Sequence, residues 1–295
     1  MKKIFATIIL GLVGMFSLPA IAAEPIKIAA IFAKTGIAAK DNAPNFEGIS
    51  LAVEEINSQG GVLGRQLEVI ELDNSSNSIG SKQAALKAVE LDVVAVIGAA
   101  WSSHSLAIAP VLQQKQIPMI SPISTNPKVT LIGNFIFRVC FTDPFQGKVM
   151  AQFAYRDLKA RTAIILTNVN SDYCIGLAEF FEKSFIQSGG KVLWEGEYKE
   201  KAIDFSTTLK KVRLLQPNVV FVPGYIQDSA LIIKQAKKME IRSIFIGGDG
   251  WSGDRMYEYG GKAIEGGYYS QHWHYKVPFH RSQQLQANYH RKYGT

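Results

Sequence analysis

The sequence has 295 residues, of which 47% are hydrophobic, and a formal net charge of +7. This length exceeds the usual size of one domain, so two domains are expected. The basic residues are scattered over predicted helix faces and loops instead of gathering in one patch, which argues against binding of nucleic acid.

Residues 1–23 are predicted to be a secretory signal peptide. Lys2 and Lys3 give a positive start, residues 4–18 are apolar, and small residues around Ala22 and Ala23 form a cleavage region. The apolar stretch is short for a membrane span. No cysteine lies near the cut to carry a lipid anchor. We therefore expect a mature, periplasmic protein that begins at Ala23 or Glu24.

Strand and helix patterns then alternate, as in a doubly wound parallel sheet. Gly60 and Gly61 end the first of these helices in the expected way. The predicted strands are 26–32, 67–72, 93–98 and 118–121, and the predicted helices are 46–57, 82–91 and 105–114.

A second run of the same kind comes next. It starts after the predicted strand 135–141. Its predicted strands are 162–167, 192–198, 218–222 and 243–247, and its predicted helices are 145–158, 177–188, 205–215 and 229–239. A further helix is predicted at 281–293, after the chain returns to the first lobe. Two α/β lobes in series are the natural interpretation. We assign residues 24–141 to the first lobe and 142–268 to the second, with 269–295 returning to the first lobe.

Cys140 and Cys174 are the only cysteines in the chain. A disulfide between them is possible in an oxidising compartment, but the sequence does not establish one. Cys140 falls in the apolar stretch 137–141, which is predicted to be a strand and would equally suit a buried free thiol.

Two loops with hydroxyl side chains lie just after neighbouring predicted strands. Ser102 and Ser103 come after strand 93–98, and Ser124 and Thr125 come after strand 118–121. In an open parallel sheet, ligands bind outside the carboxyl ends of the strands. Ser102 and Ser103 also open a predicted helix, where backbone N–H groups favour an anion. The two loops therefore predict a wall that binds a carboxylate.

Several further motifs occur along the chain in one order. They are residues 54–65 (EEINSQGGVLGR), 97–105, 117–122 with 125–127, 137–138 with 143 and 146–147, 204–206, and 245–251 (FIGGDGW). Together they resemble the branched-chain amino-acid-type periplasmic binding proteins of ABC importers, the leucine/isoleucine/valine-binding group. The resemblance spans residues 26 to about 294.

This resemblance implies an α/β fold of two doubly wound, Rossmann-like lobes. They would be joined by crossover strands and close on a ligand in the cleft between them. The protein would capture a small amino acid or related zwitterion and deliver it to a membrane permease of an ABC transporter. It would be a monomer without a cofactor, metal or catalytic activity.

The resemblance also implies how the ligand is held. Its carboxylate would contact Ser102 and Thr125, with Ser103 and backbone groups near Ile123 and Ser124. Its ammonium would pair with an acidic residue of the other lobe. This arrangement suits the chemistry, because charge-assisted hydrogen bonds are the strong ones. The acidic residue is Asp249, and the tyrosines that close over the ligand are Tyr173 and Tyr225.

The chain departs from the family in three places. The family often has an aromatic residue near Lys40 and Asp41, where a charge at the pocket rim would favour a ligand more polar than leucine. A common disulfide is missing, because its positions are Ser76 and Trp101, and Trp101 is expected to add an aromatic wall. The family also normally continues past this C-terminus, so the return to the first lobe is expected to be incomplete. Any continuation of the protein beyond Thr295 is left open.

Two other classes of function compete with this interpretation. A periplasmic ligand-sensing domain of a signalling receptor remains the alternative. An esterase that uses Ser102 lacks the Gly-x-Ser-x-Gly turn, and adjacent residues rarely meet as nucleophile and base. His272 and His274 alternate on a predicted strand, but a metal site needs three or four converging ligands. The side chain of the ligand is left open.

Overall fold

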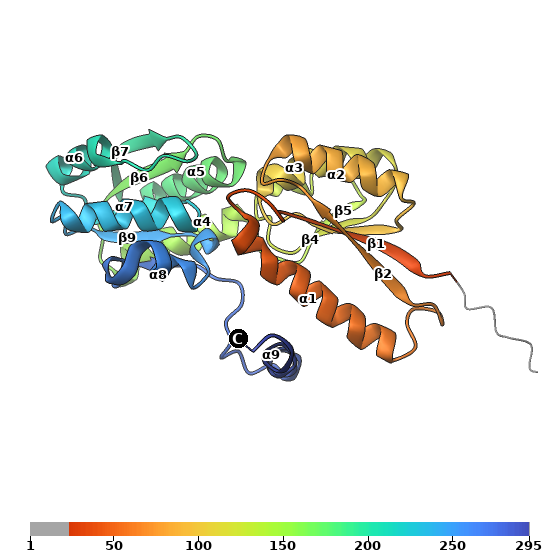
Figure 1. The fold of residues 1–295 in the computed structure, drawn as a ribbon. Helices are drawn as coiled ribbons and strands as arrows, with labels where there is room; N and C mark the ends of the chain where they lie inside the picture. Colours follow the sequence, from red (N-terminus) through yellow and green to blue (C-terminus); the bar gives the residue numbers. More distant parts are fainter. Residues whose placement is uncertain (1–23, 295) are drawn as a thin grey trace, which may run out of the picture.

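A computed structural model describes residues 24–294, so the predicted signal peptide and its cleavage site lie outside the described residues. Two parallel sheets of five strands lie side by side, each flanked by helices (Figure 1). The predicted α/β fold of two lobes is confirmed. Within residues 24–294, no helix combines the length and the apolar character needed to cross a membrane.

The first sheet has the strand order β2-β1-β3-β4-β5. Its strands are β1 (Ile26–Phe32), β2 (Leu67–Asp73), β3 (Ala95–Gly98), β4 (Met119–Ser121) and β5 (Ile136–Arg138). Its helices are α1 (Ala39–Ser58), α2 (Ser78–Glu90) and α3 (Ser102–Gln114).

The second sheet repeats this order as β7-β6-β8-β9-β10. Its strands are β6 (Thr162–Asn168), β7 (Lys191–Tyr198), β8 (Val219–Val222), β9 (Ile244–Gly247) and β10 (Tyr268–Tyr269). Its helices are α4 (Asp143–Gln152), α5 (Asp172–Gln187), α6 (Ser206–Leu215), α7 (Ile226–Lys238) and α8 (Arg255–Gly260).

The two faces of each sheet pack on different helices because alternate strand residues point to opposite sides. In β6, Ile164 and Leu166 pack with residues of α6 and α7, whereas Ala163 and Ile165 pack with α4 and α5. In β1, Ile31 packs towards α2 and α3, and Phe32 packs towards α1. These apolar layers bring the carboxyl ends of both sheets to the junction of the lobes.

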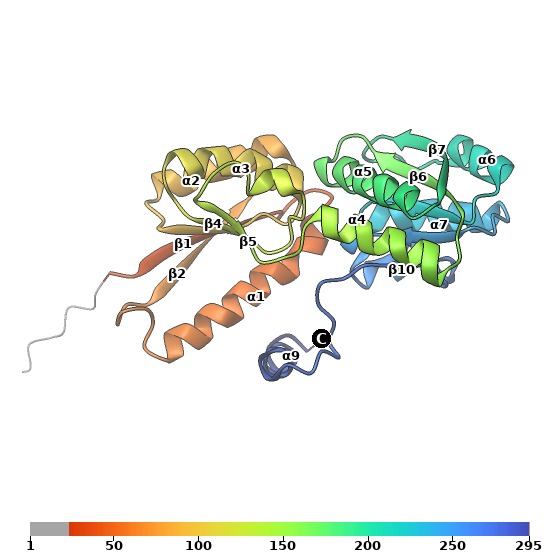
Figure 2. The ribbon, with the colours of Figure 1, turned by 180° about the vertical axis from the view of Figure 1, so that it is seen from behind.

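The chain passes between the lobes after β5 and again after β10 (Figure 2). After the second passage, α9 (His280–Tyr293) contacts α1 of the first lobe. Tyr289 donates a hydrogen bond to Glu47, and Lys292 pairs with Glu54. The division of the chain at residues 141 and 268 stays a prediction.

Two local predictions are wrong. Helix α1 begins seven residues earlier than expected and runs through Pro44, which costs one backbone hydrogen bond near the helix start. The buried Asn42 side chain accepts a hydrogen bond from Ala33 N at 3.2 Å and ties this turn to β1. Asp41 therefore lies in the first turn of a helix rather than in a loop.

Strand β5 also ends at Arg138, so Cys140 lies outside it. It is half-buried, Cys174 is buried, and both thiols are free. The structure thus contains no Cys140–Cys174 disulfide.

Candidate functional site

A cavity of about 180 Å³ lies between the lobes, at the carboxyl ends of strands from both sheets. The strand order of each sheet reverses between β1 and β3, and between β6 and β8. Loops at such a reversal leave a crevice in which ligands bind. The cavity is smaller than the 300–1,000 Å³ or so of sites for drug-sized ligands. Its size suits a molecule with few heavy atoms.

Most of the predicted site residues line this cavity. They come from separate loops of both lobes, which the two parallel sheets bring to one place. The predicted residues in its wall are Asp41, Trp101, Ser102, Ile123, Tyr173, Tyr225 and Asp249.

Ser103, Ser124 and Thr125 are not part of the cavity wall. The Ser103 hydroxyl accepts a hydrogen bond from Asp172 N at 3.0 Å and so bridges the lobes. The Ser124 hydroxyl lies 2.8 Å from that of Ser105 and is fully buried. Thr125 is buried, and its hydroxyl lies near the carboxyl group of Asp143. A ligand contact by any of the three stays a prediction.

Asp249 is held in place by its own lobe. One carboxylate oxygen accepts hydrogen bonds from Gln146 Nε2 at 2.8 Å and from the Tyr173 hydroxyl at 2.9 Å. The other oxygen lies 3.8 Å from His272 Nδ1. Burial raises the pKa of Asp249 to about 7, against the effect of the Tyr173 hydrogen bond. Since its side chain is only 9% exposed, a cation in the cavity would pair with it away from bulk water.

A second acidic group lies buried close to Asp249. Both carboxylate oxygens of Asp143 are buried without a hydrogen-bond partner. Burial raises the pKa of Asp143 to about 7; the nearby Thr125 hydroxyl and Arg138 oppose that rise, and Asp249 adds to it. Arg138 also donates to Ser124 O at 2.6 Å and thereby holds the loop after β4. Two buried carboxyl groups therefore lie close together on the second-lobe side of the cavity, and each is only partly ionised near pH 7.

Direct contacts across the cleft join the two lobes. Arg255 Nη1 lies 2.6 Å from Asp41 Oδ1, and both side chains are 20% exposed. The rings of Trp101 and Tyr225 stack with centroids 4.0 Å apart. Asn126 Nδ2 donates to Asp172 O at 2.7 Å. The two lobes are therefore in direct contact around the cavity.

Sequence reasoning missed the roles of Gln146, Arg255 and His272 at this site. Gln146 belongs to one of the family motifs, but a motif gives no direction for its side chain. His272 was considered as a metal ligand or as a partly exposed strand residue, yet it lines the cavity. Within residues 24–294, no three histidine, cysteine or acidic side chains converge as a metal site would require. No sequence pattern pointed to Arg255, because its partner Asp41 is 214 residues away in the chain.

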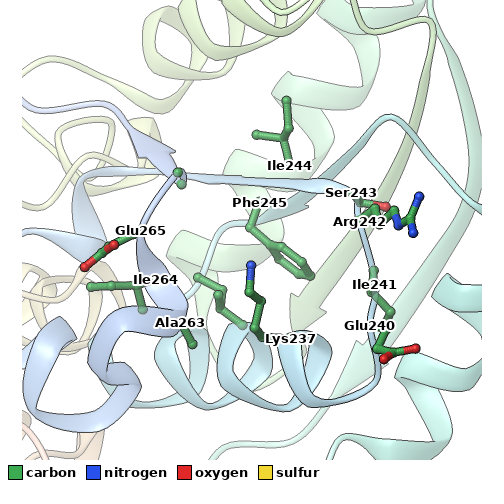
Figure 3. A pocket seen from close by; sticks show the side chains of 13 residues that line it. Lys237, Glu240, Ile241, Arg242, Ser243, Ile244, Phe245, Ala263, Ile264 and Glu265 are labelled. Atoms are coloured by element: carbon green, nitrogen blue, oxygen red, sulfur yellow. The ribbon is translucent and has the colours of Figure 1, made fainter.

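A larger hollow of about 640 Å³ lies elsewhere, beside the start of β9 (Figure 3). Its side chains come from the end of α7, the start of β9 and residues 263–267, and include Lys237, Glu240 and Phe245. None of the predicted site residues lines it. The amino end of a parallel strand is not where such sheets bind ligands, so the smaller cavity between the lobes is the candidate site.

Comparisons with known proteins identify the family of this chain. The leucine-specific-binding protein of Salmonella typhimurium is 27% identical over 267 residues, which are 90% of this chain and 72% of that protein. A crystal structure of the leucine binding protein LivK from Thermotoga maritima is 37% identical. The two structures match with a TM-score of 0.87, and the match covers 92% of this chain and 77% of the LivK chain.

The branched-chain amino acid transporter substrate binding protein LivJ of Streptococcus pneumoniae, solved in complex with isoleucine, is 28% identical. The match has a TM-score of 0.86 and covers 92% of this chain and 78% of the LivJ chain. The profile of the periplasmic binding protein family matches residues 25–295. The chain therefore belongs to the periplasmic binding protein family, as its motifs predicted, and is a solute-binding protein rather than an enzyme.

Proposed function

We propose that this protein captures a small amino acid by closing its lobes, and delivers it to the membrane permease of an ABC importer. The single observation that carries the proposal is the pairing of opposite chemistries across one small cavity. Ser102 contributes a hydroxyl from the first lobe, and Asp249 contributes a carboxylate from the second. A zwitterion presents the complementary groups to both.

Each end of the cavity suits one end of such a ligand. Ser102 begins α3, whose first backbone N–H groups and dipole favour a carboxylate. Asp249, in its ionised form, suits an ammonium group. Ser102 accepts a hydrogen bond from Asn126 N at 3.2 Å, which leaves its own proton available to the ligand. Tyr173 and Tyr225 also line the cavity and provide aromatic walls.

Closure would connect binding to transport. The ion pair of Asp41 with Arg255 and the stack of Trp101 on Tyr225 both join the lobes, so a permease would distinguish the closed form from the open one by shape. The relative solved with isoleucine is named as a transporter substrate binding protein, which favours import over the sensory alternative. We further propose that the protein is periplasmic, is cleaved near Ala22 or Ala23, and acts as a monomer.

A thermal-shift screen of the chain from Glu24 onward tests the proposal. A ligand at 100 times its Kd stabilises the folded state by about 2.7 kcal/mol, which raises the melting temperature by roughly 5–10 °C. The matched controls are the amide and the deaminated acid of each amino acid that binds. A shift with an amino acid but with neither control supports the proposal. Equal shifts with the deaminated acid would refute the role of Asp249.

A further inference from the structure

The stack of Trp101 on Tyr225 divides the space between the lobes into two cavities. The candidate site, of about 180 Å³, is called the inner cavity here, and the other, of about 240 Å³, is called the outer cavity. The two share Asp41, Trp101 and Tyr225 and no other residue. With ring centroids 4.0 Å apart and planes within 13°, the two rings are in contact and leave no passage between them.

The indole of Trp101 is held from both sides. On the first lobe it stacks on His104, with centroids 5.2 Å apart. His104 is buried, and its Nδ1 lies 3.2 Å from Asn74 Nδ2. On the second lobe Trp101 meets Tyr225. Its position in the closed protein is therefore set by packing.

The outer cavity offers apolar surface to whatever enters it. Ile37 and Ile203 line it and are 37% and 71% exposed. Its charged residues are Lys201 and the acidic Asp41, Glu200 and Asp228, and Asp41 is paired with Arg255. The Asp228 carboxylate is already engaged by the Tyr198 hydroxyl at 2.5 Å. This lining suits an uncharged hydrocarbon chain better than a charged group.

We propose that Trp101 sets the longest ligand side chain that the closed cleft accepts, and that the outer cavity is a subsite for straight apolar chains once the indole is removed. This inference rests on the proposed function, since it takes the inner cavity to hold the α-amino and carboxylate groups. Trp101 and Tyr225 belong to different lobes, so their stack re-forms only when the lobes close. A side chain that crosses the ring plane prevents that closure.

Calorimetry with a homologous series tests the inference: alanine, 2-aminobutyrate, norvaline, norleucine and 2-aminoheptanoate. The wild type should bind best at one short length and lose at least tenfold in affinity for the longest member. In Trp101→Ala the optimum should move to longer chains, with about fourfold gained per added methylene beyond the wild-type optimum. Trp101→Leu, which keeps an apolar side chain in the first lobe, should give an intermediate profile.

Ile203→Asp is the matched control because Ile203 lines only the outer cavity. In the wild-type background it should leave the binding of short members unchanged. In the Trp101→Ala background it should abolish the gain for long members. An equal loss of affinity for every chain length in Trp101→Ala and Trp101→Leu would overturn the inference while leaving the proposed function intact. A wild-type protein that binds no α-amino acid would instead refute the proposed function and this inference with it.

Discussion

Replacing Asp249 with asparagine should remove both affinity and a pH dependence of binding. The carboxylate is 9% exposed, and burial raises its pKa to about 7. Only its ionised form pairs with an ammonium group, so binding must release a proton wherever the free protein is protonated. The affinity of the wild type should therefore fall as the pH drops below 7.

The magnitude of this effect is set by the pKa of Asp249. Between pH 8.5 and pH 5.5 the ionised fraction of a group with a pKa of about 7 falls roughly 30-fold, and the Kd should rise by the same factor. At pH 8.5 the loss of a partner from a buried charge pair costs about 2–5 kcal/mol, so Asp249→Asn should weaken binding by at least roughly 30-fold. Near pH 5.5 the ratio of the two Kd values should be roughly 30-fold smaller than at pH 8.5.

Isothermal titration calorimetry in buffers of different ionisation enthalpy measures both the Kd and the proton released. Other titratable groups near Asp249 are Asp143, Tyr173 and His272; burial lowers the pKa of His272 and raises that of Tyr173 well above its usual value. Asp143→Asn is the control, because losing its charge should lower the pKa of Asp249 and move the profile to lower pH. A pH profile of Asp249→Asn with the wild-type slope would refute the reasoning.

Three further outcomes are expected. Arg255→Gln should weaken ligand binding about tenfold or less and enlarge the radius of gyration of the liganded protein in X-ray scattering, since it removes the ion pair with Asp41 that joins the lobes; an unchanged Kd at low salt would contradict this. Burial lowers the pKa of His104 from 6.5 to about 4. Its contribution to the stability of the folded protein is therefore complete above pH 6.5 and is lost as the pH falls towards 4. Between pH 7.5 and pH 4.5, the free energy of unfolding measured with urea should fall by about 2–3 kcal/mol more in the wild type than in His104→Phe. Intact mass analysis should find both Cys140 and Cys174 as thiols, and a thiol reagent should label them slowly in the folded protein because burial raises the pKa of Cys140 to about 12; a mass lower by two hydrogens would show a disulfide instead.

The fold was predictable from the sequence because its signals are local. Apolar runs such as 26–32 and 219–222 are long enough for buried strands and too short for helices. Their alternation with amphipathic helices leads to a parallel sheet, and a parallel sheet collects the loops after its strands at one edge. This rule predicted that Ser102 lies at the cavity, whereas Tyr173, Tyr225 and Asp249 were expected there because of the resemblance to the family; all four line it.

The boundaries of elements were harder, because packing decides them. The apolar pattern predicted that α1 starts at residue 46, but the helix begins at Ala39, and the buried Asn42 side chain ties its first turn to the end of β1. Likewise, residues 139–141 are apolar enough for a strand, yet β5 ends at Arg138, where the chain leaves the first sheet. Local propensity predicts neither the early start of α1 nor the early end of β5.

The sequence by itself determined two α/β lobes and the chemistry of the loops at their carboxyl ends, because hydrophobic periodicity and residue type act over a few positions. Only the tertiary structure decided which hydroxyls face the cavity and which form hydrogen bonds with other parts of the same chain. Ser102 lies in the wall, whereas its neighbour Ser103 contacts Asp172 of the other lobe, a difference set by the direction of two adjacent side chains. The pairing of Asp41 with Arg255 likewise depends on how two separately folded lobes meet, which no local pattern records.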